Sequence, residues 1–418
     1  MNGAGLVKSP GGVTVALSFC LATNLAPLMT FPAVLPEVSN VWHLSASEAG
    51  WIGGIYFAGY AIAVPVLSSA TDRVDGRWVV ATSSLLATLA GMAFAELASG
   101  FWMALILRFF GGIALAGVHM PGLTLLTERI RERGQGRAVS IYTSSYAVGS
   151  SGSFLLAGLV DAMFGWRYAF LASAIGPALA IAAVAILSPP PPRQAAAGVV
   201  ADFRNVLRNR AFMAYVVGFA GNTWEVFGIR VWFVACLAWV ACIPGNNLDL
   251  PNLALIAGVA SLAGVPASVI VAELASRGNR ARVIIATCIL SVAVCLALAV
   301  MVGSGGILVL SLLVLLQITS FADVGALGVG AVIAADPRRR GTAMAVYALA
   351  GFTTGFFGPA VGGLALDLFG GSDSASGWTA AFLVMAIGSS AAAFAVWFGH
   401  RCGVADRFAV GAKPERHR

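Results

Sequence analysis

Four charged residues stand inside long apolar stretches of the sequence: Arg108, Glu225, Arg230 and Asp323. A charge placed in hydrocarbon costs ~2.5–3.5 kcal/mol even on a lenient insertion scale, so each should face protein or water and have a function. Carboxyl groups can take up and release protons, and guanidinium groups bind anions through several N–H donors. These residues therefore predict a buried site that exchanges protons and binds an anion.

The spacing of these residues along helices indicates which of them share a face. His119 follows Arg108 by eleven residues, which is ~16 Å along a helix and within ~20° of the same direction, so both can line one cavity. A lone histidine is a hydrogen-bonded packing residue about as often as it lines a functional cavity. Glu225 and Arg230 are five residues apart, or ~140° around a helix, so they do not form a simple same-face pair. Their partners should lie on other helices.

Polar and aromatic residues accompany these charges. Asn222 and Trp224 flank Glu225, and Trp224 could wall a binding pocket or could simply pack. Glu225 lies near the middle of its apolar stretch, where a carboxyl shielded from water has the property that a proton carrier needs. Asp323 is a second candidate proton site, with a buried partner of Arg or His as the alternative. Asn24 is a polar candidate near the N-terminus.

The composition of the chain indicates the environment in which it folds. Of its 418 residues, 59% are hydrophobic and 10% are charged, and the mean hydropathy is +0.88. A water-soluble domain carries about 25% charged residues, and apolar runs of ~20 residues are long enough to cross a bilayer. We therefore expect an all-α membrane protein with 12 transmembrane helices. The predicted spans are 13–36, 47–70, 78–97, 102–126, 138–162, 168–188, 211–240, 253–275, 283–303, 306–333, 342–368 and 379–400.

Basic residues fall in alternate loops and in the two tails. This is the positive-inside pattern, and it places both termini and the central linker in the cytoplasm. The net charge of +7 thus reflects topology and does not indicate a nucleic-acid partner. The basic segments are Lys8, Arg73 and Arg77, 129–137, 193–210, 277–282, 338–340 and 401 onward.

The two halves of the chain repeat. The segment 137–142 aligns with 342–347 at a shift of 205 residues, and the loop 68–77 matches 272–282 at nearly the same shift. Four prolines at 189–192 end the preceding helix and begin a polar stretch. We expect an N-terminal six-helix bundle (1–188), a cytoplasmic linker (189–210), a C-terminal six-helix bundle (211–400) and a cytoplasmic tail (401–418), with the two bundles related by pseudo-symmetry.

The loop that begins Asp72-Arg73 and ends Gly76-Arg77 resembles the signature cytoplasmic loop of the major facilitator superfamily. In that family the aspartate and arginines hold the cytoplasmic side closed, and a carboxylate at a helix N-terminus suits such a latch. Ser68 replaces the first glycine of the motif, and one extra residue precedes Gly76. The resemblance implies a cytoplasmic gate made of Asp72, Arg73, Arg77 and, from the second copy, Arg277.

Two further motifs extend the resemblance. Arg108 followed by Gly111 and Gly112 looks like the fourth-helix motif of the superfamily, and the run 358–363 resembles a glycine–proline motif that drug–proton antiporters carry in helix five. Here that run lies in helix eleven, which favours tight packing over antiport. In the superfamily, helices one, four, seven and ten surround the central cavity, and the four intramembrane charges fall on helices four, seven and ten.

Together these features predict a secondary active transporter that moves a small anionic organic solute across the cell membrane of a bacterium, coupled to protons. The alternative is a proton-coupled exporter of amphiphilic drugs or metabolites, and a membrane sensor or membrane-embedded enzyme on the same fold is a distant third. Helices two and eight lack the arginines that bind nitrate in the nitrate–nitrite branch. We expect a monomer with no metal, cofactor or enzymatic activity. The predicted substrate-binding residues are Asn24, Arg108, His119, Asn222, Trp224 and Arg230, and the predicted proton-coupling residues are Glu225 and Asp323.

Overall fold

The computed structural model describes residue 7 and residues 9–130, 134–188, 203–244, 246, 250 and 252–401. Within these residues the chain is helical, apart from one isolated bridge between Val7 and Leu187. The helices are α1 (Pro10–Asn24), α2 (Thr30–Trp42), α3 (Ala46–Ala70), α4 (Gly76–Leu97), α5 (Phe101–Arg129), α6 (Gln135–Phe164), α7 (Trp166–Ala185), α8 (Phe203–Arg208), α9 (Arg210–Ala241), α10 (Leu253–Arg277), α11 (Arg280–Met301), α12 (Gly306–Ala322), α13 (Val324–Ala334), α14 (Arg340–Leu368) and α15 (Ala375–Arg401).

Eleven helical segments of the described chain are long and apolar enough to cross a membrane. The first predicted span is not among them, because it is divided into α1 and α2 around Pro27. Proline lacks the N–H group that would continue the helix, so one continuous helix over 13–36 was a wrong prediction. The tenth predicted span is also interrupted, at Asp323 between α12 and α13.

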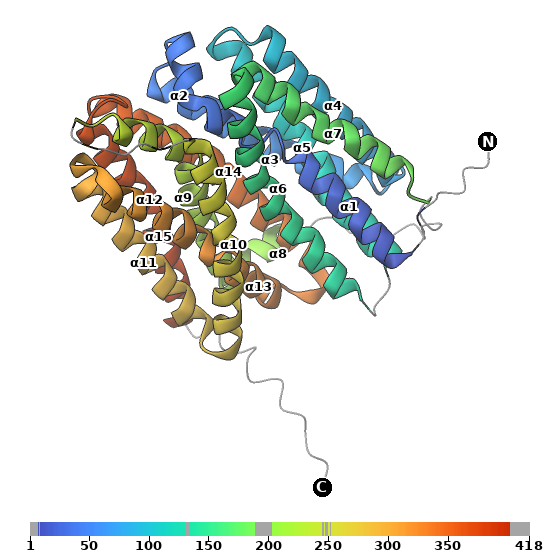
Figure 1. Ribbon diagram of the computed structural model, residues 1–418. Coiled ribbons are helices and arrows are strands. Elements are labelled where there is room, and N and C mark those ends of the chain that lie inside the picture. The colour runs from blue at the N-terminus through green and yellow to red at the C-terminus, as the bar shows by residue number, and fades with distance from the viewer. Residues whose placement is uncertain are drawn as a thin grey trace.

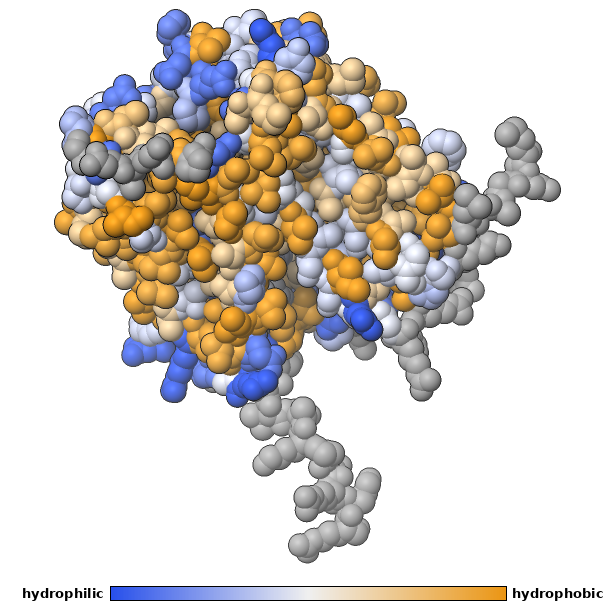
Figure 2. Space-filling view, in the orientation of Figure 1, coloured by the Kyte–Doolittle hydropathy of each residue, from blue (hydrophilic) through white to orange (hydrophobic). Residues whose placement is uncertain are grey.

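The hydropathy of the surface agrees with helices that span a membrane. Hydrophobic residues form a broad belt around the middle of the molecule, and hydrophilic residues gather at both ends (Figure 2). Side chains such as Val300, which is 86% exposed, and Trp102, which is 73% exposed, would be costly in water and are stable against lipid. We call the end where α1 begins and α15 ends the terminal end, and the other the opposite end.

The early helices lie on one side of the molecule and the late helices on the other (Figure 1). Helix α3 packs on α5 within the first group and on α14 of the second, and α6 packs on α10. Glycines allow the close approach: a Cβ on Gly50 would lie 2.4 Å from the carbonyl oxygen of Pro359. The predicted linker lies outside the described residues up to position 202, and its remainder forms α8 and the start of α9. The predicted tail lies outside them beyond Arg401.

Candidate functional site

Arg108 lies on α5 and holds the break between α1 and α2. Its guanidinium donates hydrogen bonds to the carbonyl oxygens of Pro27 (2.9 Å) and Leu28 (3.0 Å), with a longer one to Ile52 of α3 (3.5 Å). The guanidinium carbon also lies 4.6 Å from the centre of the Tyr56 ring. A helix break exposes carbonyls that would otherwise be unpaired in the interior. The charge of Arg108 is therefore engaged by the protein backbone.

Arg230 lies on α9 and is only 2% exposed. Its Nη1 donates to the Ser150 hydroxyl of α6 at 3.3 Å, which joins the two helix groups, and its guanidinium lies 4.9 Å from the centre of the Phe321 ring. Within the described part of the chain, no acidic side chain forms an ion pair with it. A buried guanidinium with five donors and one hydrogen-bond partner has the capacity to bind an anion.

His119 belongs to a cluster of tyrosines beside Arg230. Its Nδ1 shares a hydrogen bond of 2.8 Å with the Tyr60 hydroxyl, and its carbonyl oxygen accepts one of 2.7 Å from Tyr142. The rings of His119 and Tyr146 lie 5.2 Å apart. Both Arg108 and His119 contact α3, as their spacing indicates. These hydrogen bonds tie α3, α5 and α6 together at the level of the predicted cavity.

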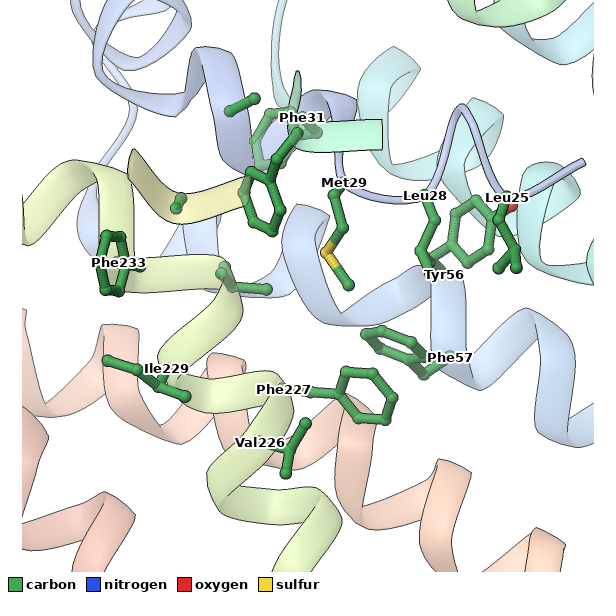
Figure 3. Packing of buried hydrophobic residues seen from close by; sticks show 14 of the residues in the cluster. Leu25, Leu28, Met29, Phe31, Tyr56, Phe57, Val226, Phe227, Ile229 and Phe233 are labelled. Carbon is green, nitrogen blue, oxygen red and sulfur yellow. The ribbon is translucent and has the colours of Figure 1, made fainter. Parts of the chain in front are cut away.

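Aromatic rings fill the contact between α3, α9 and α14. The ring centres of Phe57 and Phe227 are 3.8 Å apart, and those of Tyr60 and Phe352 are 3.9 Å apart. Figure 3 shows Phe57 of α3 and Phe227 of α9 facing one another. Packed aromatic rings bury large apolar areas. The site thus has an aromatic wall to which both helix groups contribute.

Glu225 is fully buried among the later helices, away from this wall. It accepts hydrogen bonds from Ser291 (2.8 Å) and Cys295 (3.3 Å) of α11 and from Ser389 of α15. Its side chain is 0% exposed, and it makes no ion pair within the described chain. This carboxyl group is held by neutral donors only.

Asp323 lies at the break between α12 and α13. It accepts hydrogen bonds from Asn222 (2.7 Å) and from the Cys288 thiol (3.2 Å). Asn222 also donates to the carbonyl oxygen of Ser320, which the break leaves free (2.7 Å). Cys288 and Ser291 lie one turn apart on α11 and bond Asp323 and Glu225, and the two carboxyl groups are close enough to interact electrostatically. The two predicted proton-coupling residues therefore belong to one buried polar cluster.

The remaining predicted substrate-binding residues face elsewhere. Asn24 hydrogen-bonds the Cys20 carbonyl (2.9 Å) and Ser84 of α4 (3.1 Å), inside the early helices. Trp224 donates to the carbonyl oxygen of Val384 on α15 (2.9 Å) and so packs between later helices. Asn222 contacts Asp323, as described above. The structure therefore places His119 beside Tyr60 of the aromatic wall and Arg230 beside Ser150 and Phe321. Asn24, Asn222 and Trp224 have their hydrogen bonds elsewhere.

The predicted gate residues make local contacts at the terminal end. Asp72 and Arg73 are exposed. Arg77 pairs with Asp75 (2.7 Å) and donates to the Leu187 carbonyl, and Arg277 pairs with Glu273 one turn earlier on α10 (2.7 Å). None of these contacts of the described residues joins the early helices to the late ones, so the terminal end is not latched by them in this conformation.

The opposite end is joined across the two groups. Asp367 of α14 accepts hydrogen bonds from the backbone N–H groups of Ala46 and Ser47, and Asn252 beside α10 donates to the Gly158 carbonyl of α6 (2.7 Å). Sequence reasoning missed Asp367, and it also missed Tyr56 and Tyr146. A signal was present for the tyrosines, because Tyr56 and Tyr60, and Tyr142 and Tyr146, are four residues apart and so share helix faces. Among the described residues, no His, Cys, Asp and Glu side chains gather as metal ligands would.

The arrangement matches known structures. A bacterial homolog of the human lysosomal transporter spinster, in an inward-facing and occupied conformation, superposes with a TM-score of 0.76 at 15% identity, over 93% of this chain and 96% of the other. A family model described as Major Facilitator Superfamily matches residues 17–335. The chain belongs to this superfamily. It therefore has the major facilitator fold and is a multi-pass membrane transporter, not an enzyme.

Curated members of the superfamily match parts of the chain. The niacin transporter NiaP of Acinetobacter baylyi is 33% identical over 138 residues, which is 33% of this chain and 31% of that protein. Human protein spinster homolog 1 is 23% identical over 285 residues, 62% of this chain and 53% of that protein. A benzoate transport protein of Acinetobacter baylyi is 24% identical over 155 residues, 35% of this chain and 33% of that protein. The chain thus spans about a third to a half of the length of these relatives.

Proposed function

We propose that this major facilitator transporter moves a small organic anion across a bacterial cell membrane, coupled to protons, by alternating access. The observation that carries the proposal is Arg230, a buried guanidinium at the contact between the helix groups with a single described hydrogen bond, to Ser150. An unpaired charge at this depth is costly unless a ligand of opposite sign visits it. The niacin and benzoate carried by two relatives are small organic anions and support this assignment.

Proton coupling is assigned to Glu225 and Asp323. Both carboxyl groups are buried with neutral donors and without a cationic partner. An ionised carboxylate in such surroundings is unfavourable, so a bound proton would stabilise this conformation. Asp323 lies two residues after Phe321, whose ring packs on Arg230. Loss of the proton would disturb the α12–α13 break and, through Phe321, the anion site.

The terminal end is assigned to the cytoplasm from the positive-inside pattern. The predicted gate residues Asp72, Arg73, Arg77 and Arg277 make no described contact across the helix groups there, whereas Asp367 and Asn252 join the groups at the opposite end. The conformation is then inward-facing, and the transporter acts as a monomer with its pathway between the two groups.

An exporter of amphiphilic compounds is the second candidate. The aromatic wall between Phe57 and Phe227 would suit such a cargo. A cationic cargo between the helix groups would, however, meet the guanidinium of Arg230, while Glu225 lies among later helices. The unpaired cation at the contact between the groups favours the organic anion.

The test uses the purified full chain in liposomes that enclose a pH-sensitive dye. Small carboxylates, amino acids and amphiphilic cations are added outside, and proton movement and solute uptake are recorded for the wild type, Arg230→Gln and the exposed control Arg167→Gln. Carboxylate uptake that Arg230→Gln abolishes and Arg167→Gln retains supports the proposal. Carboxylate uptake that is equal in all three proteins, or a response to amphiphilic cations alone, contradicts it.

A further inference from the structure

Two buried tyrosine hydroxyls close to the buried arginines lack hydrogen-bond partners within the described chain. The hydroxyl groups of Tyr56 on α3 and Tyr146 on α6 are shielded from solvent and have no partner within the described chain. Their neighbours one turn away differ, because Tyr60 bonds His119 and Tyr142 bonds backbone carbonyls. Buried polar groups are nearly always paired, so two orphan hydroxyls in one place need an explanation.

The two tyrosines lie between the two buried arginines in the network of neighbouring side chains. The Tyr146 phenol is close enough to interact electrostatically with both the Arg230 guanidinium and the Tyr56 phenol. Tyr56 itself is 1% exposed. Ser150, which accepts a hydrogen bond from Arg230 at 3.3 Å, lies one turn after Tyr146 on α6, and Tyr56 lies beside Arg108 at 4.6 Å. Unpaired donors from α3, α6 and α9 are therefore neighbours at the interface, and no acidic side chain of the described residues bonds them.

We infer that Tyr56, Tyr146 and Arg230 form the carboxylate subsite of the transport site, and that the substrate is an aromatic monocarboxylate. A carboxylate has two oxygen atoms with about four acceptor positions, enough for two hydroxyl groups and the free N–H groups of one guanidinium. This inference rests on the proposed function and specifies its substrate class.

The hydrogen bonds of the two buried arginines indicate that the substrate carries a single carboxylate. Arg108 uses three of its five N–H groups on the carbonyls of Pro27, Leu28 and Ile52, so its charge is already compensated by the backbone. Arg230 uses one, on Ser150, and so has more free donors for a carboxylate. A dicarboxylate would bury one charge without a partner, which is strongly unfavourable.

The aromatic character of the proposed substrate is inferred from the rings that surround the subsite. Phe321 packs on the Arg230 guanidinium at 4.9 Å, and His119 lies 5.2 Å from Tyr146. Phe57 and Phe227 add ring faces from α3 and α9. A flat ring next to the carboxylate can stack on such faces, whereas a saturated ring of the same size cannot do so as closely.

The experiment measures the affinity of the purified full chain for three probes by calorimetry: benzoate, its neutral analogue benzamide, and cyclohexanecarboxylate. The variants are Tyr56→Phe and Tyr146→Phe, with Tyr168→Phe as a control whose side chain is 57% exposed on α7. Thermal unfolding verifies that each variant folds.

We expect benzoate to bind more tightly than the other two probes, and each of Tyr56→Phe and Tyr146→Phe to weaken benzoate binding by roughly tenfold or more. The ratio of benzoate to benzamide affinity should fall in those variants, since a general distortion would weaken both probes alike. The Tyr168→Phe control should not change the ratio. Each tyrosine variant tests the inference by itself, so one variant that folds is enough to decide it.

Other outcomes separate the two proposals. If cyclohexanecarboxylate binds as well as benzoate, or if Tyr56→Phe and Tyr146→Phe behave like Tyr168→Phe, the inference is wrong even when Arg230→Gln abolishes carboxylate uptake and the proposed function stands. If no carboxylate binds the wild-type protein in calorimetry or enters liposomes that contain it, both the inference and the proposed function are wrong.

Discussion

Asp367 accepts a hydrogen bond of 2.7 Å from the backbone N–H of Ser47, and its second oxygen accepts one of 3.0 Å from the N–H of Ala46. Asp367 is on α14 and the two donors begin α3, so one carboxylate caps the N-terminus of a helix from the other half of the chain. Ser45 and Glu48 complete the cap within α3 itself. Helix starts have free N–H groups and a positive dipole end, which favour a carboxylate.

We predict that Asp367→Asn loosens the opposite end. Hydrogen bonds to a charged group contribute about 1.5–3 kcal/mol, so their loss should raise the opening of this contact by tenfold or more. Hydrogen exchange followed by mass spectrometry reads this directly, as faster exchange of the backbone amides at the start of α3. Asp373→Asn is the control, since Asp373 is exposed at the same end. Equal exchange in both variants would show that Asp367 is not a latch.

Arg108 gives a prediction about stability. In Arg108→Gln the carbonyls of Pro27 and Leu28 lose a charged donor, and each such bond contributes about 1.5–3 kcal/mol. We expect a clearly lower thermal unfolding midpoint in detergent, while the control Arg167→Gln, on an exposed side chain, leaves the midpoint unchanged. A stable Arg108→Gln protein that has lost substrate binding would instead support the substrate-binding role predicted from the sequence.

The buried carboxyls give a prediction about pH. Uptake of a carboxylate that enters with a proton should accelerate when the outside is more acidic than the inside, because protonation of Glu225 and Asp323 then precedes the inward step. Glu225→Gln and Asp323→Asn imitate the protonated groups and should lose this acceleration while retaining exchange of solute for solute. Glu96→Gln, on an exposed carboxyl at the opposite end, should respond like the wild type. Full pH dependence in both buried variants would remove the proton-coupling assignment.

Much of the fold was predictable because the cost of exposing polar groups to lipid acts along the whole chain. Long apolar runs, basic loops and the repeat of 205 residues located the helices and their order. The breaks at Pro27 and Asp323 were not predicted. Each depends on a distant side chain, Arg108 or Asn222, that accommodates the freed carbonyl groups.

The candidate site was predictable in type but not in partners. Hydrophobicity indicates that Arg230 and Glu225 are buried, yet the direction in which each side chain points depends on how α9 is rotated against its neighbours. The ~140° between them places Arg230 toward α6 and Glu225 toward α11 and α15. Trp224 was assigned to the pocket because it is aromatic, but its position on α9 turns it to α15. For uncharged residues such as Tyr146 the one signal is the four-residue spacing from Tyr142, which indicates a shared helix face but no partner.

Close packing at Gly112 gives the last prediction. A Cβ at this position would lie 1.8 Å from the carbonyl oxygen of Tyr56, so Gly112→Ala must push α5 away from α3. Overpacking of this kind costs about 1–3 kcal/mol, and the displacement would also move Tyr56. We expect a lower unfolding midpoint and weaker benzoate binding. Gly152→Ala on α6 is the matched control, because nothing lies within 4 Å of its Cβ position. If both alanine variants unfold at the wild-type temperature, α3 and α5 are not in the close contact described.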